Sequence, residues 1–172
     1  MQQNRYDKEP LTAVEAQRLA QEIAFGPIVF QVSRLMLKFG IFKLLADHRN
    51  GRTQEEISKA CGLSSYAAQV LLEASLTIGT VLLREGRYSL AKAGWFLLND
   101  KMVHVNMDFN QDVNYLGMFH LEEALTNGRP EGLKVFGEWS TLYEGLSTLP
   151  PQVQKSWFGF DHYSSDCSFD VA

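Results

Sequence analysis

The fold class of this chain follows from residues 53–90, which read TQEEISKACGLSSYAAQVLLEASLTIGTVLLREGRYSL. Thr53, with Glu56 three positions later, predicts a capping box, in which each side chain accepts a hydrogen bond from the backbone N–H of the other residue. Gly62 is placed to end this short helix. A longer helix over about 65–78 follows, with its apolar residues on one face. The segment therefore begins as two helices joined by a tight turn.

The residues after Gly79 predict a β-hairpin, because two short apolar segments flank a polar turn at residues 84–87. Helix, turn, helix and a two-stranded wing together form the winged-helix pattern. The later segments near 103–115, 117–126, 139–146 and 151–163 are predicted to be helical. The expected fold class is therefore mainly α, a winged helix-turn-helix with flanking helices and one small hairpin.

Two helices are expected before this pattern. Thr12 and Glu15 repeat the capping-box spacing, and small or apolar residues recur at helical spacing up to Ala24. The second helix, about 28–47, is apolar on nearly every side, and Gly40 is a point where it can kink or divide. A surface helix of a monomer normally carries one apolar stripe. We therefore expect a homodimer built on these helices, with three candidate residues at its seam: Phe30, Leu37 and Phe42.

Charge is distributed unevenly over the 172 residues, whose net charge is −4. Residues 1–94 carry twelve basic and nine acidic side chains, whereas residues 95–172 carry four and eleven. Within residues 53–94 acids and bases balance at four each, and the helix over 65–78 has no Lys or Arg. Because phosphate neutralisation supplies most of a protein's affinity for DNA, we expect no nucleic-acid partner.

Composition also disfavours other classes of protein. Cys61 and Cys167 are too few and too far apart for a disulfide framework, and the four histidines show no metal-ligand spacing. The N-terminus lacks the apolar core of a secretion signal. Charged residues interrupt the longest apolar stretch before it reaches the roughly 20 residues of a membrane span. We expect a cytoplasmic protein with no membrane contact and no metal site.

The order of these motifs resembles the N-terminal region of S-adenosylmethionine-dependent O-methyltransferases that act on small molecules. The matching positions in the winged-helix segment are Thr53, Glu56, Ile57, Ser58, Gly62, Leu63, Leu71, Leu72, Tyr88, Leu90 and Gly94. In the helical connector that follows, they are residues 127–130, Phe136, Gly137, Leu142, Tyr143, Pro150, Trp157 and Phe158. The resemblance covers about residues 12–165 and implies that subunits intertwine through their N-terminal helices.

The resemblance also implies how the chain is divided. Residues 1–11 are expected to form a frayed tail, 12–100 the dimerisation helices and winged helix, and 101–172 a connector toward a catalytic domain. Family members hold S-adenosylmethionine at a glycine-rich loop after the first strand of that domain, which also carries their catalytic base. This sequence has no strand followed by such a loop. We therefore expect no catalytic, cofactor-binding or metal-binding residue in the chain, and no activity from the chain alone.

In the family the connector faces the substrate, so the resemblance implies a set of pocket-lining residues. Phe158 and His162 have the four-residue spacing of the family's substrate-facing helix. A place in the core is the alternative for the aromatic side chains, and a plain exposed histidine is the alternative for His162. The candidates are Met118, Phe119, Trp157, Phe158, Phe160 and His162.

The function predicted from the sequence is dimerisation and substrate-pocket lining for the transfer of a methyl group from S-adenosylmethionine to a hydroxyl. Two alternatives stay open. One is a free-standing winged-helix transcription regulator that binds DNA, which the charge balance disfavours. The other is a module for protein–protein interaction. The sequence names no substrate.

Overall fold

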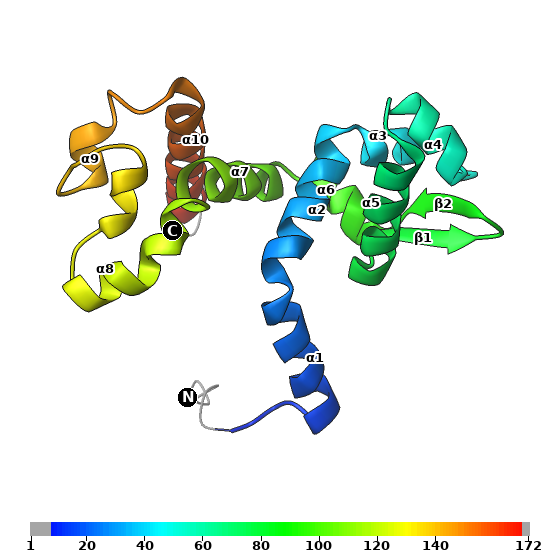
Figure 1. Cartoon of the computed structure of the whole chain (residues 1–172), viewed down its shortest axis with the longest axis horizontal. Helices are drawn as coiled ribbons and strands as arrows, with labels where there is room; N and C mark the ends of the chain where they lie inside the picture. The colour runs from blue at the N-terminus through cyan, green and yellow to red at the C-terminus, as the bar shows by residue number, and fades with distance from the viewer. Residues whose placement is uncertain (1–7, 170–172) are drawn as a thin grey trace. The chain divides into compact units, whose positions relative to one another are not determined.

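The computed structural model describes residues 8–169, with side chains described up to residue 165. It forms two compact units, one ending at Trp95 and the other beginning at Phe96 (Figure 1). The described residues are mainly helical, and their one sheet is an antiparallel pair of strands. The predicted fold class is confirmed. No helix in this part of the chain is long and apolar enough to cross a membrane.

The first unit follows the predicted order of elements. Capping boxes form at Thr12 and Thr53, as expected. The apolar helix expected over 28–47 is divided, because Gly40 adopts a left-handed φ of 72° and begins a new helix. The elements are α1 (Ala13–Ala24), α2 (Gly26–Lys38), α3 (Ile41–Asp47), α4 (Gln54–Ala60), α5 (Ser65–Ile78), β1 (Val81–Arg84), β2 (Arg87–Leu90) and the beginning of α6 (Lys92–Asn99).

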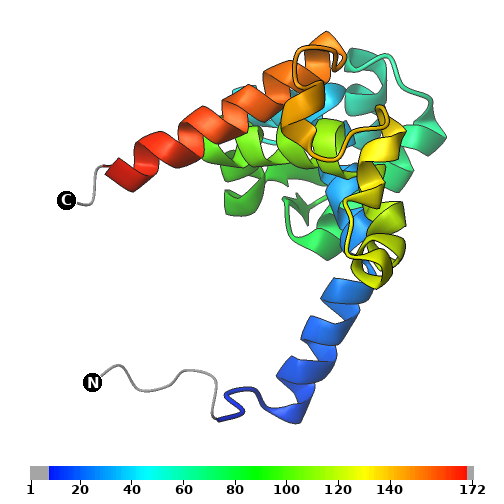
Figure 2. The same cartoon turned by 90° about the vertical axis from the view of Figure 1, so that its left-hand side faces the viewer.

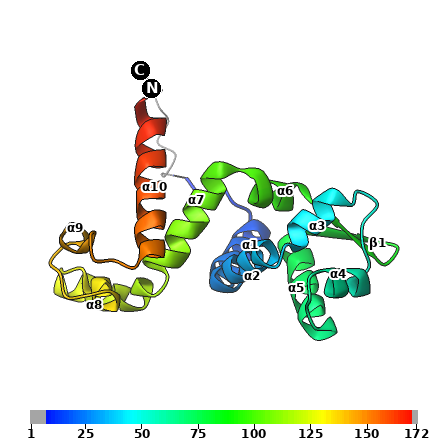
Figure 3. The same cartoon turned by 90° about the horizontal axis from the view of Figure 1, so that it is seen from above.

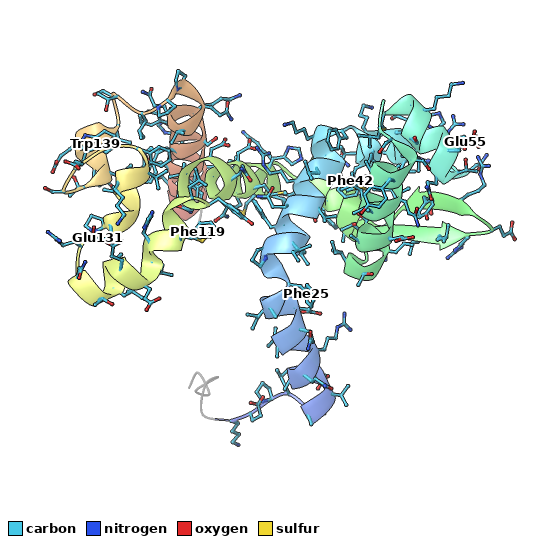
Figure 4. The ribbon with its side chains drawn as sticks, in the orientation of Figure 1. Phe25, Phe42, Glu55, Phe119, Glu131 and Trp139 are labelled. Atoms are coloured by element: carbon cyan, nitrogen blue, oxygen red, sulfur yellow. The ribbon has the colours of Figure 1, made fainter. Side chains whose placement is uncertain are left out.

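The core of the first unit lies between α2, α3, α4, α5 and the hairpin, which Figure 3 shows grouped together. Apolar side chains from all of these elements meet there, and α2 packs on α5 while α3 packs on β2. Phe42 is the largest of the fully buried side chains and lies within this group in Figure 4. The other large apolar side chains with almost no exposure are Met36, Ile41, Leu45, Ile57, Leu72 and Val81.

Glu56 joins the start of α4 to the hairpin. Its carboxylate accepts hydrogen bonds from the backbone N–H of Thr53 at 2.8 Å, from Arg87 at 3.2 Å and from Arg52 at 3.3 Å. Arg52 also exchanges two backbone hydrogen bonds with Tyr88 of β2, at 2.9 and 2.7 Å. These bonds, led by the one from Thr53, hold the pKa of Glu56 below its usual value.

We predict that Glu56→Gln lowers the thermal midpoint of unfolding at neutral pH. Because the pKa of Glu56 is depressed in the folded state, its charge stabilises the fold above the unfolded-state pKa of about 4.3. That contribution is lost as the pH falls through the folded-state pKa. The difference in midpoint between the wild type and the variant should therefore shrink as the pH is lowered from about 7 to about 3. The exposed neighbour Glu55 provides the control, and an equal effect of Glu55→Gln would contradict the assignment.

The second unit is built on α10, the long helix drawn in orange and red in Figure 2, which packs against α7. Val113, Leu149 and Val153 are the buried centre of its core. Asp112 ties the two sides together, because its Oδ2 accepts from Ser156 at 2.7 Å and from Gln152 at 2.8 Å. The elements after α6 are α7 (Lys101–Phe109), the π-helix η1 (Asn110–Asn114), the 3-10 helix η2 (Gly117–His120), α8 (Leu121–Asn127), the 3-10 helix η3 (Glu131–Val135), α9 (Leu142–Gly145) and α10 (Pro151–Phe169).

Candidate functional site

The candidate ligand site is a hollow of about 360 Å³ in the second unit, which we call the apolar hollow. None of its lining residues is charged. Apart from the indole of Trp157, the only polar side chain among them is that of Asn114. A concave, mostly apolar surface with few polar groups is the usual character of a small-molecule site. The lining consists of Val113, Asn114, Gly117, Met118, Leu121, Ala124, Pro130, Gly132, Leu133, Phe136, Leu142 and Trp157.

One wall of the apolar hollow depends on the close approach of two glycines. A Cβ atom added to Gly132 of η3 would lie 2.9 Å from the carbonyl oxygen of Gly117 in η2. A Cβ atom added to Gly117 would lie 3.3 Å from the carbonyl oxygen of Gly132. The two backbones therefore touch only because neither residue has a side chain.

Ion pairs fix η3 to α8 beside this contact. Lys134 of η3 pairs with the carboxylate of Glu123, and His120 Nδ1 lies 3.4 Å from the same carboxylate. The hydrogen bond from Lys134, with a smaller effect of His120, holds the pKa of Glu123 below its usual value. Because these side chains are partly exposed, the pairing orients η3 more than it stabilises the fold.

We predict that Gly132→Ala destabilises the second unit. The added methyl group meets backbone rather than a flexible side chain, so η2 and η3 must separate, at a cost of roughly 1–3 kcal/mol. Thermal unfolding of the purified chain measures this loss. Gly159→Ala is the matched control, because Gly159 lies within α10 and an added Cβ meets no atom within 4 Å. Equal midpoints for the two variants would contradict the glycine contact.

The residues expected to line a pocket are found in different places. Met118 and Trp157 line the apolar hollow. Phe119 is 81% exposed on η2, where Figure 4 labels it, and Phe158 is also exposed. Two expected residues have ring contacts outside the lining: Phe160 stacks on Phe109 with centroids 3.9 Å apart, and the exposed ring of His162 lies 6.4 Å from that of Phe158.

Sequence reasoning missed most of the lining. Asn114 and Val113 reach the apolar hollow from a π-helix, which has no sequence signal of its own. Gly117 and Gly132 act through the absence of a side chain. The Gly-rich stretch from Gly128 to Gly137 was the one available clue, since clustered glycines favour close backbone contacts.

The first unit carries an apolar surface on α1 and on the start of α2. No residue of α1 is buried. Ile23 is 69% exposed, and the apolar surface continues through Phe25, labelled in Figure 4, to Ile28. Of the residues expected at a dimer seam, Phe42 is fully buried within its own unit, whereas Phe30 and Leu37 are half-buried. The surface open to a partner therefore lies nearer the N-terminus than Phe42.

Reactive groups are sparse in the described part of the chain. Within it, no three His, Cys, Asp or Glu side chains lie together as a metal site would need. Cys61 is half-buried at the end of α4, and burial raises the pKa of its thiol, which disfavours the reactive thiolate. The side chain of Cys167 lies outside the described residues.

Comparison with known proteins shows what this chain is similar to. Residues 17–88 match the family model of the Dimerisation2-like domain. An L-tyrosine C(3)-methyltransferase from Streptomyces lavendulae is 28% identical over 142 residues, which are 80% of this chain and 38% of that protein. Residues 17–88 are thus similar to a dimerisation-type domain, and the chain is similar in sequence to part of a small-molecule methyltransferase.

Solved structures share the fold of this dimerisation domain. The S-adenosylmethionine-dependent methyltransferase SibL, in its apo form, has a TM-score of 0.73 at 23% identity, over 87% of this chain and 45% of its own. The N,N-8-amino-8-demethyl-D-riboflavin dimethyltransferase RosA from Streptomyces davawensis has a TM-score of 0.65 at 25% identity, over 88% of this chain and 44% of its own. The chain thus spans less than half the length of these relatives.

Proposed function

We propose that this chain supplies the subunit interface and one wall of the substrate pocket for a methyltransferase that uses S-adenosylmethionine. The observation that carries the proposal is α1, a twelve-residue helix that buries no residue against the rest of its own unit. An isolated helix of this length is marginal in water. Because residues 17–88 match a Dimerisation2-like domain, we assign the missing cover to a second copy.

One side of α1 is suited to such a contact. Ala13, Ala16, Ala20, Ile23 and Ala24 recur at helical spacing, so they share a face. Small side chains allow a neighbouring helix to approach closely, and Ile23 can fill a gap between them. In a two-fold dimer the same surface is used by both copies. The polar residues Glu15, Arg18 and Glu22 lie on the other side, where Arg18 and Glu22 form an ion pair.

We predict that Ile23→Lys converts a dimer into a monomer, because it places a charge on the apolar face of α1. Lysine is tolerated in the last turn of a helix, so the change does not itself oppose helix formation. Val14→Lys is the matched control: Val14 is equally accessible, at 75% exposed, and lies nine residues away, about 180° around the helix. Light scattering on the wild type and both variants measures the molar mass and therefore the oligomeric state.

A wild type that stays monomeric at micromolar concentration would contradict the proposed dimer. Loss of the dimer in Val14→Lys, but not in Ile23→Lys, would move the interface to the other side of α1. Stable dimers of this kind bury about 2,000 Å² or more, so both α2 and the α1 face are expected to contribute.

The acceptor atom of the methyl group is not decided by this domain. We inferred a hydroxyl from the resemblance to O-methyltransferases, yet the names of the relatives include methyl transfer to carbon and to nitrogen. The proposal therefore assigns to this chain only the positioning of a small molecule, through the apolar hollow. Positioning contributes to rate by holding the reacting atoms in line.

We predict that the chain alone does not bind S-adenosylmethionine. In doubly wound α/β domains the cofactor binds at a glycine-rich loop that follows a parallel strand. Over residues 8–169 the strands instead form an antiparallel hairpin with a two-residue turn. Isothermal titration with the cofactor should give no heat of specific binding. A micromolar site would overturn the assignment of cofactor binding to another domain.

The α5 helix supports a structural use of the helix-turn-helix rather than DNA binding. Its exposed side chains include Ser65, Tyr66, Gln69 and Glu73, and Gln69 donates a hydrogen bond to Glu73 at 2.8 Å. The helix has no Lys or Arg to neutralise a phosphate. We therefore keep the proposal of no nucleic-acid partner.

A further inference from the structure

Asn114 is the polar exception in the apolar hollow. Its Nδ2 donates a hydrogen bond to Oδ1 of Asn110 at 3.4 Å. Among the described residues, its Oδ1 and its second N–H have no other partner. An amide in this state offers one acceptor and one donor to whatever fills the apolar hollow.

The two basic side chains that adjoin lining residues in the sequence, Arg129 and Lys134, are already paired with acids. Lys134 is bound to Glu123, and Arg129 lies 3.2 Å from Glu131. None of these four side chains belongs to the lining. A charged ligand group that entered the apolar hollow would lose its water without gaining a partner, which is costly.

We propose that the part of a ligand that occupies the apolar hollow is uncharged and largely apolar, and that it bears one neutral hydrogen-bonding group paired with the Asn114 amide. The inference rests on the proposed role of this domain as a pocket wall. It makes Asn114 a specificity-determining residue. The ammonium and carboxylate of an amino acid find no partner in this lining.

The test uses the 172-residue chain and the fluorescence of Trp157, which lines the apolar hollow. The probes are 1-naphthol, naphthalene and 1-naphthoate, which share one ring system and differ in a hydroxyl or a charge. Asn114→Leu removes the amide, and Asn106→Leu makes the same change at an exposed position on the neighbouring helix α7. Trp157→Phe checks that the signal comes from the apolar hollow.

The wild type should bind 1-naphthol roughly five-fold more tightly than naphthalene, as one neutral hydrogen bond allows, and 1-naphthoate least tightly. In Asn114→Leu the preference for 1-naphthol should disappear, while Asn106→Leu should keep it. Tighter binding of 1-naphthoate than of 1-naphthol, or an unchanged preference in Asn114→Leu, would overturn the proposal.

The experiments can refute the proposed ligand binding and the proposed dimer independently of each other. If no probe perturbs Trp157 while light scattering still shows a dimer, the ligand inference is overturned and the proposed interface stands. If the chain is monomeric but shows the expected probe preference, the interface is overturned and the ligand inference stands. Far-UV circular dichroism of each variant confirms that it is folded before either result is read.

Discussion

The uncovered helix α1 is the constraint on which the rest of this structure depends. Twelve residues with one apolar face and no buried residue do not form a stable helix in water unaided. The helix does not pack onto the core of its own unit but continues α2 away from it (Figure 1). We propose that a second copy covers this helix, in keeping with the match of residues 17–88 to a Dimerisation2-like domain.

The remainder of the first unit gives α1 a rigid base. Gly40 separates α2 from α3, which lets Ile41 and Phe42 turn into the core. Glu56 then ties α4 to the hairpin through two arginines. The helix-turn-helix often binds DNA through basic side chains. Here Arg52 and Arg87 instead pair with the carboxylate of Glu56 within the same unit.

The packing of the second unit forms a concave apolar surface. Its core holds a π-helix against α10 through Asp112 and Ser156, and the paired glycines bring η3 against η2. The result is a concave apolar surface with one amide. We propose that this surface holds part of a small molecule in place, and that the reacting groups of a methyl transfer lie in the part of the relatives' length that this chain does not span.

Local sequence rules predicted most helices and the hairpin of this fold. Contacts between residues far apart in the sequence could not be predicted in the same way. The two capping boxes, the division at Gly40 and the hairpin each depend on residues a few positions apart, so the sequence shows them directly. An apolar helix does not show which of its sides faces its own core, which is why Phe42 was expected at a seam and lies in the core.

The apolar hollow was harder to predict for the same reason. Its lining comes from segments up to 44 residues apart, from Val113 to Trp157. It includes residues of a π-helix and two glycines whose backbones are in contact. Met118 and Trp157, which the family resemblance suggests as pocket residues, belong to this lining, whereas Asn114 required the three-dimensional arrangement.

Hydrogen exchange at the backbone amides of α1, followed as a function of protein concentration, tests the central claim most directly. If a second copy covers α1, the amides of residues 16–24 will be protected at high concentration and will lose that protection on dilution. The amides of α5 will stay protected throughout, because that helix is packed within its own unit. Protection of α1 that is independent of concentration, or exchange of α1 at the rate of an unfolded peptide at every concentration, would contradict the account.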